Sequence, residues 1–156
     1  MNYLFSTILM LVSFTICLAS CSKDAESTLT ENTESTNNPI GSKMKITIGS
    51  AVFTATLTDN ATSTAFKTML PLTINMSELN GNEKFYYLSS TLPTNAATVE
   101  SIQTGDLMLY GNNCLVLFYE NLNTSHSYTR LGKIDNIPGL VSALGNGNVI
   151  VKFEME

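Results

Sequence analysis

Few residues in this 156-residue chain could do acid–base or nucleophilic chemistry. The stretch YTRLGKID, residues 128–135, contains the only arginine, Arg130, and closely follows the only histidine, His126. A Ser–His–Asp or Cys–His arrangement needs a histidine that a third group orients, and nothing in the polar turn NTSHSY orients His126. We therefore interpret His126 as an exposed loop residue.

Arg130 has two interpretations. Strict alternation along a strand places it on the same face as Tyr128, so its guanidinium group could reach a ligand pocket. Alternatively, a strand arginine on an outer face lays its aliphatic stem over neighbouring side chains and pairs with a carboxylate. We favour the second interpretation; under the first, Arg130 is the one candidate for a catalytic residue.

The remaining reactive side chains give no pattern of a catalytic or metal site. Glu78, Glu83 and Glu120 are scattered, and Asp106 in TGDL is placed to satisfy the amides of a turn. Cys114 opens the apolar run CLVLFYE, which predicts a buried, inert thiol. With one histidine and one free cysteine in the domain, we expect no metal site, and we expect no cofactor.

The first residues resemble an export signal. An apolar run over residues 4–19, broken by hydroxyl residues, is too short for a membrane span of about 20 residues and is typical of a secretory signal. The sequence LASC, residues 18–21, resembles the lipobox of bacterial lipoproteins, in which the thiol of Cys21 accepts a diacylglyceryl group. We predict a signal peptide over residues 1–20, although its first residues carry no Lys or Arg. A buried N-terminal helix is the less favoured alternative.

Residues 21–42 are predicted to be a lipidated cysteine and a disordered tether. They are rich in Ser, Thr, Asn and Glu, so they cannot bury enough apolar surface to offset the entropy of ordering. The expected partner is therefore a membrane, held through acyl chains on Cys21. Ser22 follows the cysteine where inner-membrane retention usually requires Asp, which favours the outer membrane and leaves the leaflet open. The net charge of −5 and the lack of a basic run argue against nucleic acid.

Residues 43–156 are expected to form one mainly β domain. Clean alternation over residues 44–57 predicts a hairpin, and apolar residues at helical spacing predict a helix over 59–70 that Pro71 ends. A second, short helix is expected over 136–145. Further strands are expected at 72–76, 84–88, 107–110, 114–120, 127–134 and 148–154, and residues 89–106 show no strong period. About eight antiparallel strands close naturally into a barrel, which removes exposed edges.

Three stretches in this order carry a resemblance to a known family. The opening GSAVFTATLTDNATSTAFKTML, the segment GDLMLYGNNCLVLFYENL and the strand YTRLGKID are similar to the small bacterial cyclophilin-like domains. The similarity covers essentially all of residues 43–156. It implies a closed or nearly closed antiparallel cyclophilin-like barrel of about eight strands with two short helices.

The same resemblance implies a pocket wall without the family's catalytic groups. Active cyclophilins place an Arg after a Phe-His pair on a middle strand, with a Gln downstream, but residues 70–88 contain no Arg, His or Gln. The family's pocket His aligns with Tyr128, and its apolar pocket strand aligns with LVLFY, so Leu117 or Phe118 could form a wall. The chain has no Trp to match the family's anchoring Trp.

The sequence leaves two main hypotheses about the function, one of a binding module and one of an enzyme. The leading hypothesis is a non-catalytic module that binds an extended peptide or small ligand in a groove on the side of the barrel. The candidate groove residues are Phe85, Tyr87, Leu117, Phe118 and Tyr128. The alternative is a divergent peptidyl-prolyl cis-trans isomerase in which Arg130 weakens the partly double C–N bond. A scaffold without a ligand is a third possibility that the sequence does not separate from the first.

Overall fold

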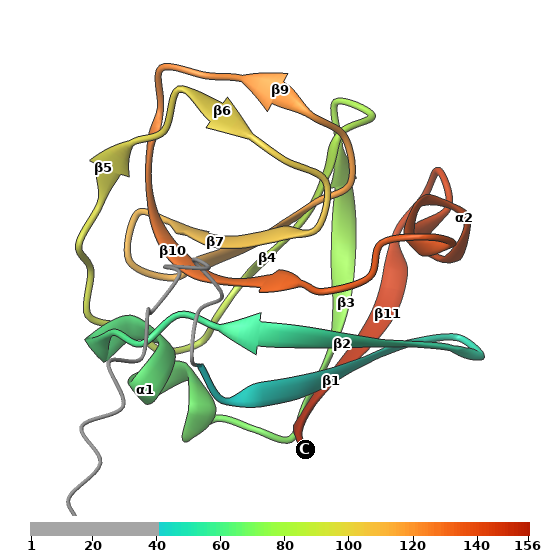
Figure 1. Cartoon of the computed structure of the whole chain (residues 1–156), viewed down its shortest axis with the longest axis horizontal. Helices are drawn as coiled ribbons and strands as arrows, with labels where there is room; N and C mark the ends of the chain where they lie inside the picture. The colour runs from blue at the N-terminus through green and yellow to red at the C-terminus, as the bar shows by residue number, and fades with distance from the viewer. Residues whose placement is uncertain (1–40) are drawn as a thin grey trace, which may run out of the picture. The chain divides into compact units, whose positions relative to one another are not determined.

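The structure is a computed structural model, and it describes residues 41–156. The expected signal peptide, Cys21 and nearly all of the expected tether lie outside the described residues. Figure 1 shows the helices and strands of the described residues. They are β1 (Lys43–Ile48), β2 (Ala51–Leu57), α1 (Ala61–Lys67), β3 (Leu72–Leu79), β4 (Glu83–Tyr87), β5 (Ala97–Thr98), β6 (Ser101–Ile102), β7 (Asp106–Tyr110), β8 (Cys114–Phe118), β9 (Leu122–Asn123), β10 (Ser127–Ile134), α2 (Leu140–Leu144) and β11 (Val149–Met155).

Eight of these strands form a closed antiparallel barrel, which confirms the predicted fold. They follow the order β2-β1-β11-β3-β4-β8-β7-β10, and β10 pairs back with β2 through Gly132 opposite Leu57. A Cβ atom at Gly132 would lie 2.6 Å from the carbonyl oxygen of Thr56, so the closure requires glycine at this position. This requirement gives a structural reason for the glycine in the LGKI motif.

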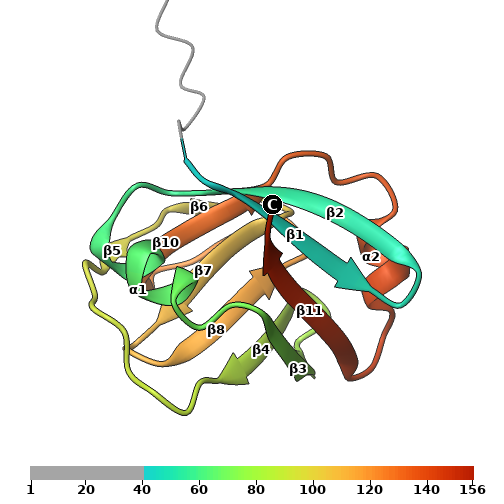
Figure 2. The same cartoon turned by 90° about the horizontal axis from the view of Figure 1, so that it is seen from below.

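The barrel interior holds the main hydrophobic core, and the two helices cover its ends. Alternate residues of each strand point inward, for example Met44, Ile46 and Ile48 of β1, all of them buried. Phe66 of α1 packs edge-on against Phe153 of β11, with ring centroids 6.1 Å apart. Leu140 is one of two residues of α2 that join the same core. Figure 2 shows α1 and α2 at opposite ends of the barrel.

Local signals in the sequence fix both helices. The side chain of Asn60 accepts a hydrogen bond of 2.8 Å from the backbone N–H of Ser63, so Asn60 is the N-cap of α1. The predicted helix over 59–70 is confirmed, although the regular part is shorter. Gly145, at φ +59°, ends α2 as the sequence predicts, because glycine adopts this left-handed conformation without strain. No helix within residues 41–156 is long and apolar enough to cross a membrane.

A second, smaller core lies outside the barrel, under a covering that we call the flap (residues 95–104 and 120–126). The flap contains β5, β6 and β9, and β6 pairs with β9; it lies at the top of Figure 1. Val99 and Ile102 of the flap pack against the outward side chains of the barrel wall. Those outward side chains are Met108 on β7, Cys114, Val116 and Phe118 on β8, and Tyr128 on β10. The wall formed by β7 and β8 is therefore buried on both faces.

A β-bulge in β10 changes which way its side chains point. The pairing with β7 shifts register between Arg130 and Gly132. Consequently Arg130 and Lys133 are both exposed on the outside, whereas Leu131 and Ile134 are both buried in the barrel. Strict alternation along β10 therefore holds from Tyr128 to Leu131 and fails beyond Leu131.

Candidate functional site

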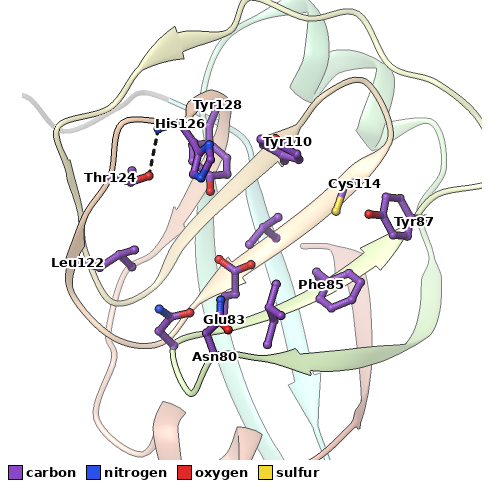
Figure 3. A pocket seen from close by; sticks show the side chains of 13 residues that line it. Asn80, Glu83, Phe85, Tyr87, Tyr110, Cys114, Leu122, Thr124, His126 and Tyr128 are labelled. Atoms are coloured by element: carbon purple, nitrogen blue, oxygen red, sulfur yellow. Dashed lines mark hydrogen bonds between the residues drawn. The ribbon is translucent and has the colours of Figure 1, made fainter.

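A pocket of about 460 Å³ lies beside the second core, between the flap and the outer wall of the barrel. Its floor comes from β4, β8, β7 and β10, and the turn between β3 and β4 closes one side (Figure 3). Because β4 alternates, its outward residues Glu83, Phe85 and Tyr87 all line this pocket, while Lys84 and Tyr86 point to the other side. One carboxylate and two aromatic rings therefore lie on the same face of this short strand.

Aromatic side chains form two walls of the pocket. On β4, the rings of Phe85 and Tyr87 pack edge-on with centroids 5.8 Å apart. Across the pocket, Tyr110 packs against Tyr128 at 5.5 Å and against His126 at 5.9 Å. These contacts hold the rings in place without closing the space between the two groups (Figure 3).

Glu83 is the acidic side chain of the pocket, and it has no salt-bridge or hydrogen-bond partner for its carboxylate among residues 41–156. In Figure 3 the carboxylate points from β4 into the space between Phe85 and Tyr128. Burial, and then the negative charge of Glu78, raise the pKa of Glu83 above its ordinary value. Asn82 also lines the pocket, and its Oδ1 atom is buried without a hydrogen-bond partner in the described part of the chain. The carboxylate of Glu83 is therefore an acceptor of the pocket that no described residue uses.

Two further titratable groups of the pocket, Cys114 and Tyr128, are held in their neutral forms. Burial and the charge of Glu83 raise the pKa of the Cys114 thiol more than its contact with Tyr87 lowers it. Burial, followed by the charge of Glu83, raises the pKa of Tyr128 to about 12. The predicted burial of Cys114 is confirmed, and a thiol with a raised pKa is a poor nucleophile at neutral pH. These groups are suited to contact a ligand and not to attack one.

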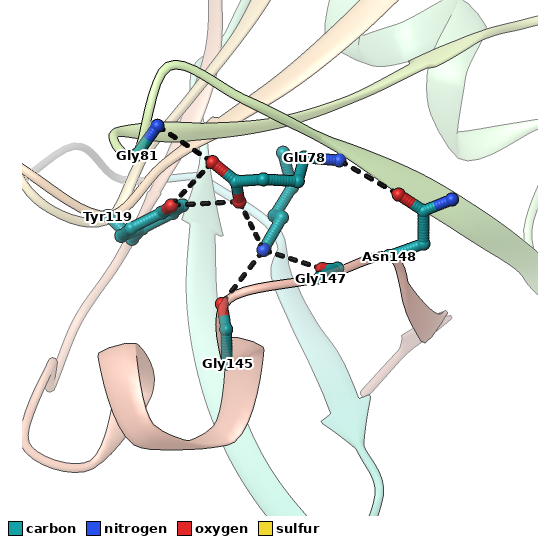
Figure 4. Close-up of polar contacts among 7 residues, drawn as sticks. Glu78, Gly81, Tyr119, Gly145, Gly147 and Asn148 are labelled. Atoms are coloured by element: carbon teal, nitrogen blue, oxygen red, sulfur yellow. Dashed lines mark hydrogen bonds and ion pairs between the residues drawn. The ribbon is translucent and has the colours of Figure 1, made fainter.

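A buried ion pair on the opposite side of β4 fixes the strand that carries Glu83 (Figure 4). Lys84 is 0% exposed, and its ammonium group donates to the carboxylate of Glu78 and to the carbonyl oxygens of Gly145 at 2.9 Å and Gly147 at 2.7 Å. Three acceptors match the three donors of an ammonium group. The pair therefore ties the β3–β4 hairpin to the segment between α2 and β11.

Glu78 is held in its charged form by this network. Its carboxylate also accepts hydrogen bonds of 2.8 Å from the hydroxyl of Tyr119 and from the backbone N–H of Gly81. Burial raises the pKa of Glu78, but the hydrogen bonds from Lys84, Tyr119 and Gly81 outweigh burial and lower the pKa overall. Burial and the hydrogen bond to Glu78 raise the pKa of Tyr119 to about 12. The charged Glu78 in turn disfavours ionisation of Glu83.

The structure separates the five residues proposed for the groove. Phe85, Tyr87 and Tyr128 line the pocket. Phe118 lies beneath it, fully buried, with its ring 5.6 Å from that of Tyr128. Leu117 belongs to the core inside the barrel, because successive residues of β8 face opposite sides of the wall. It therefore does not line this pocket.

Several lining residues lie outside the groove that the sequence predicts. Glu83, predicted to be a scattered carboxylate, lines the pocket, and His126 is exposed as predicted but lies at the pocket's edge. Tyr110 and Leu122 also line the pocket. The available signal was the alternation of EKFYY, which places Glu83 on the same face as two aromatic rings.

Arg130 lies outside this pocket. Its side chain is 52% exposed, and its Nη1 atom is 3.5 Å from the carboxylate of Asp106, which is buried. The same carboxylate pairs with Lys133 at 3.1 Å and accepts a hydrogen bond of 2.9 Å from the backbone N–H of Gln103. Two predictions are thereby confirmed: Arg130 pairs with a carboxylate on the outer face, and Asp106 satisfies a turn amide.

The described residues do not bring three or more His, Cys, Asp or Glu side chains together in a group that could hold a metal ion. Arg130 instead lines two other depressions, of about 590 Å³ and 230 Å³. The larger is lined mostly by residues 95–101 of the flap and by β10, and Tyr128 is the aromatic residue of its lining. The smaller is lined mostly by polar residues of β2, β7 and β10. Neither has the facing aromatic walls of the pocket around Glu83.

The family of this chain is shown by a comparison with models of protein families. A family model described as the cyclophilin-like family matches residues 46–154, which is most of the barrel. Searches of curated proteins and of solved structures each gave no significant match. The matched range runs from β1 to β11 and includes every strand that lines the pocket. The chain therefore belongs to the cyclophilin-like family.

Proposed function

We propose that the barrel is a non-catalytic binding module that holds an organic ligand in the pocket around Glu83. The observation that carries this proposal is a cavity of about 460 Å³ with aromatic walls and a carboxylate that has no partner among residues 41–156. Ligand sites in proteins typically have volumes of about 300–1,000 Å³, apolar or aromatic walls and a few polar groups. A carboxylate with a perturbed pKa in a cleft is a further mark of a functional site.

The size and position of the pocket limit its occupant. The flap and the β3–β4 turn bound the cavity, so it suits a small molecule, or one or two side chains of a peptide, better than a long extended segment. Tyr87 is 62% exposed and stands at the rim, where a ligand would cover it. An exposed aromatic ring beside a cavity is a common anchor for a bound partner.

The placement of Arg130 argues against the isomerase alternative. Catalysis of X-Pro isomerisation by a guanidinium group requires that group next to an apolar pocket that binds the proline ring. Arg130 instead pairs with Asp106 and does not line the aromatic pocket. Binding without isomerisation is therefore the function that this arrangement supports best.

We also propose that the chain is a lipoprotein of the cell envelope, anchored in the outer membrane through acyl chains on Cys21. The LASC motif and the polar composition of residues 22–42 support this location. The binding module would then be held near a membrane surface, on either side of the outer membrane. This proposal rests on the sequence alone.

The binding function can be tested by screening a fragment library against the purified protein with ligand-observed NMR. Fragments that bind in the pocket should lose binding to Tyr87→Ala, a change at an exposed ring that leaves both cores intact. Ile150→Ala is the matched control, because Ile150 is 63% exposed and does not line the pocket. If no fragment binds, or if all bind Tyr87→Ala and Ile150→Ala equally, the pocket is not a ligand site.

The isomerase alternative needs its own measurement. Exchange spectroscopy on proline peptides should show no acceleration of cis–trans exchange by the wild-type protein. Acceleration that disappears in Arg130→Ala, with the thermal stability unchanged, would overturn the preference for a binding function.

A further inference from the structure

We propose that the ligand of this pocket is an organic cation, with an ammonium group held between the carboxylate of Glu83 and the surrounding aromatic rings. This inference rests on the proposed binding function and names the chemical class of ligand.

Within residues 41–156, no Lys, Arg or His side chain forms a salt bridge with the carboxylate of Glu83. Glu83 is a lining carboxylate, and the lining includes no Lys or Arg. The described salt bridges use other carboxylates, namely those of Glu78, Asp106, Asp135 and Glu154. A half-buried carboxylate is destabilised unless a cation pairs with it. A bound ammonium group would supply that pairing, whereas an anionic ligand would be repelled.

The walls of the pocket also favour a cation. A cation within about 6 Å of a ring centroid is attracted by the negative face of the ring, and sets of such rings form the aromatic cages that bind ammonium groups. Here Phe85 and Tyr87 stand on one side and Tyr110 and Tyr128 on the other, and Glu83 points between them (Figure 3). The protein already uses this contact elsewhere, since Lys84 places its ammonium group 5.1 Å from the centroid of the Tyr119 ring.

The hydrogen-bonding capacity of the site matches an ammonium donor. An alkylammonium group has three N–H donors and no acceptor. The carboxylate of Glu83 and the Oδ1 atom of Asn82 both lack partners within residues 41–156. A ligand with N–H donors would satisfy the carboxylate of Glu83, and a ligand with acceptors alone would not.

Binding of a cation should depend on pH in a defined direction. Only the ionised form of Glu83 attracts an ammonium group, so affinity should fall as the pH falls through the raised pKa of Glu83. The titratable groups that face Glu83 are Glu78 on β3, Cys114 on β8, His126 before β10, and the tyrosines of the pocket walls. Because His126 lies at the edge of the pocket, the pH series is repeated in His126→Asn, so that the pH dependence can be assigned to Glu83.

A free amine and a lysine side chain of a peptide share this chemistry. The test uses four probes: 3-phenylpropylamine, the neutral 3-phenylpropan-1-ol, the anionic 3-phenylpropionate, and a blocked tripeptide acetyl-Ala-Lys-Ala-amide. Each is titrated into the purified protein, and the chemical-shift changes of the pocket amides are followed by NMR. The amine and the alcohol have nearly the same shape, so their difference isolates the charge. Tighter binding of the amine than of the tripeptide would identify a free amine as the source of the ammonium group. Tighter binding of the tripeptide would identify a lysine side chain.

We expect an ammonium probe to shift the pocket amides and to bind about tenfold to a hundredfold more tightly than the alcohol, as expected for a hydrogen bond to a charged group. Glu83→Gln should remove that preference. Glu120→Gln makes the same change of charge on an exposed residue outside the pocket, and it should leave the preference intact.

Three results would overturn the inference, and they have different consequences for the proposed binding function. If the alcohol or the propionate binds as tightly as the amine, the pocket is a ligand site but not a cation site. If none of the four probes shifts the pocket amides, neither the inference nor the binding function stands. A preference for the amine that survives in Glu83→Gln would also exclude the role of Glu83.

Discussion

Replacing Lys84 by methionine removes the ammonium group of the buried ion pair and keeps most of the side-chain volume. The substitution leaves the carboxylate of Glu78 and the carbonyl oxygens of Gly145 and Gly147 without their shared donor. Breaking a buried ion pair by removing one partner typically costs about 3–5 kcal/mol. Glu78 keeps its hydrogen bonds from Tyr119 and Gly81 and is 20% exposed, so we expect the lower end, about 3 kcal/mol.

For a domain of this size, such a loss should lower Tm by about 10 °C. The assay is thermal unfolding followed by circular dichroism, with urea unfolding for the free energy. Lys152→Met is the matched control: Lys152 pairs with Glu154 at 2.8 Å, but its side chain is 45% exposed, so its loss should hardly change Tm.

A double-mutant cycle separates the ion pair from general packing. Glu78→Gln alone leaves the ammonium group of Lys84 buried without its charged partner, whereas the double substitution removes both charges. The double variant should therefore be more stable than the sum of the two single effects predicts, by about 1–3 kcal/mol. A fall in Tm of less than about 3 °C in Lys84→Met, or simple additivity in the cycle, would refute this account of the β3–β4 hairpin.

Three further predictions follow from the pocket and the N-terminal motif. Because the pKa of Glu83 is raised in the folded state, its contribution to stability is complete below the pKa of the unfolded chain and is lost as the pH rises through the folded pKa. Glu83→Gln should therefore raise Tm at pH 7 but not near pH 4, while Glu120→Gln should show no such difference; equal effects at both pH values would contradict the assigned burial. The thiol of Cys114, which is buried and has a raised pKa, should react with a maleimide at pH 7 far more slowly than the same thiol in urea-unfolded protein, and comparable rates would contradict its placement. Cys21→Ala should abolish metabolic labelling by an alkyne fatty acid in a bacterial host, and labelling that persists would rule out lipidation at this cysteine.

Much of the barrel could be predicted because the alternation of apolar and polar residues along a strand indicates which of its faces is buried. In β1 the apolar residues Met44, Ile46 and Ile48 alternate with polar ones, so the sequence indicates both the strand and the face that is buried. The short strands β5, β6 and β9 could not be predicted, because two residues are too few to show a period. They form because the outward side chains of the barrel wall provide an apolar surface on which the flap packs.

The candidate site was predictable only in part, for a related reason. All five residues of β8 are buried, so alternation gives no indication of which of Leu117 and Phe118 faces outward. The side of the barrel that carries the pocket is indicated instead by β4, where charged and aromatic residues share one face. That Glu83 lacks a partner within the described residues is a property of the tertiary structure, and no local pattern reports it.

The wall of β7 and β8, buried on both faces, has a consequence for how such a domain diversifies. Substitutions at inward positions such as Leu115 or Leu117 alter the packing on which folding depends. Substitutions at outward positions such as Val116 or Tyr110 alter the shape and chemistry of the pocket, and they leave the inner packing untouched. One set of strands thus carries two nearly independent sets of positions, so new ligand preferences can arise by mutation in the outer set while the inner set preserves the barrel.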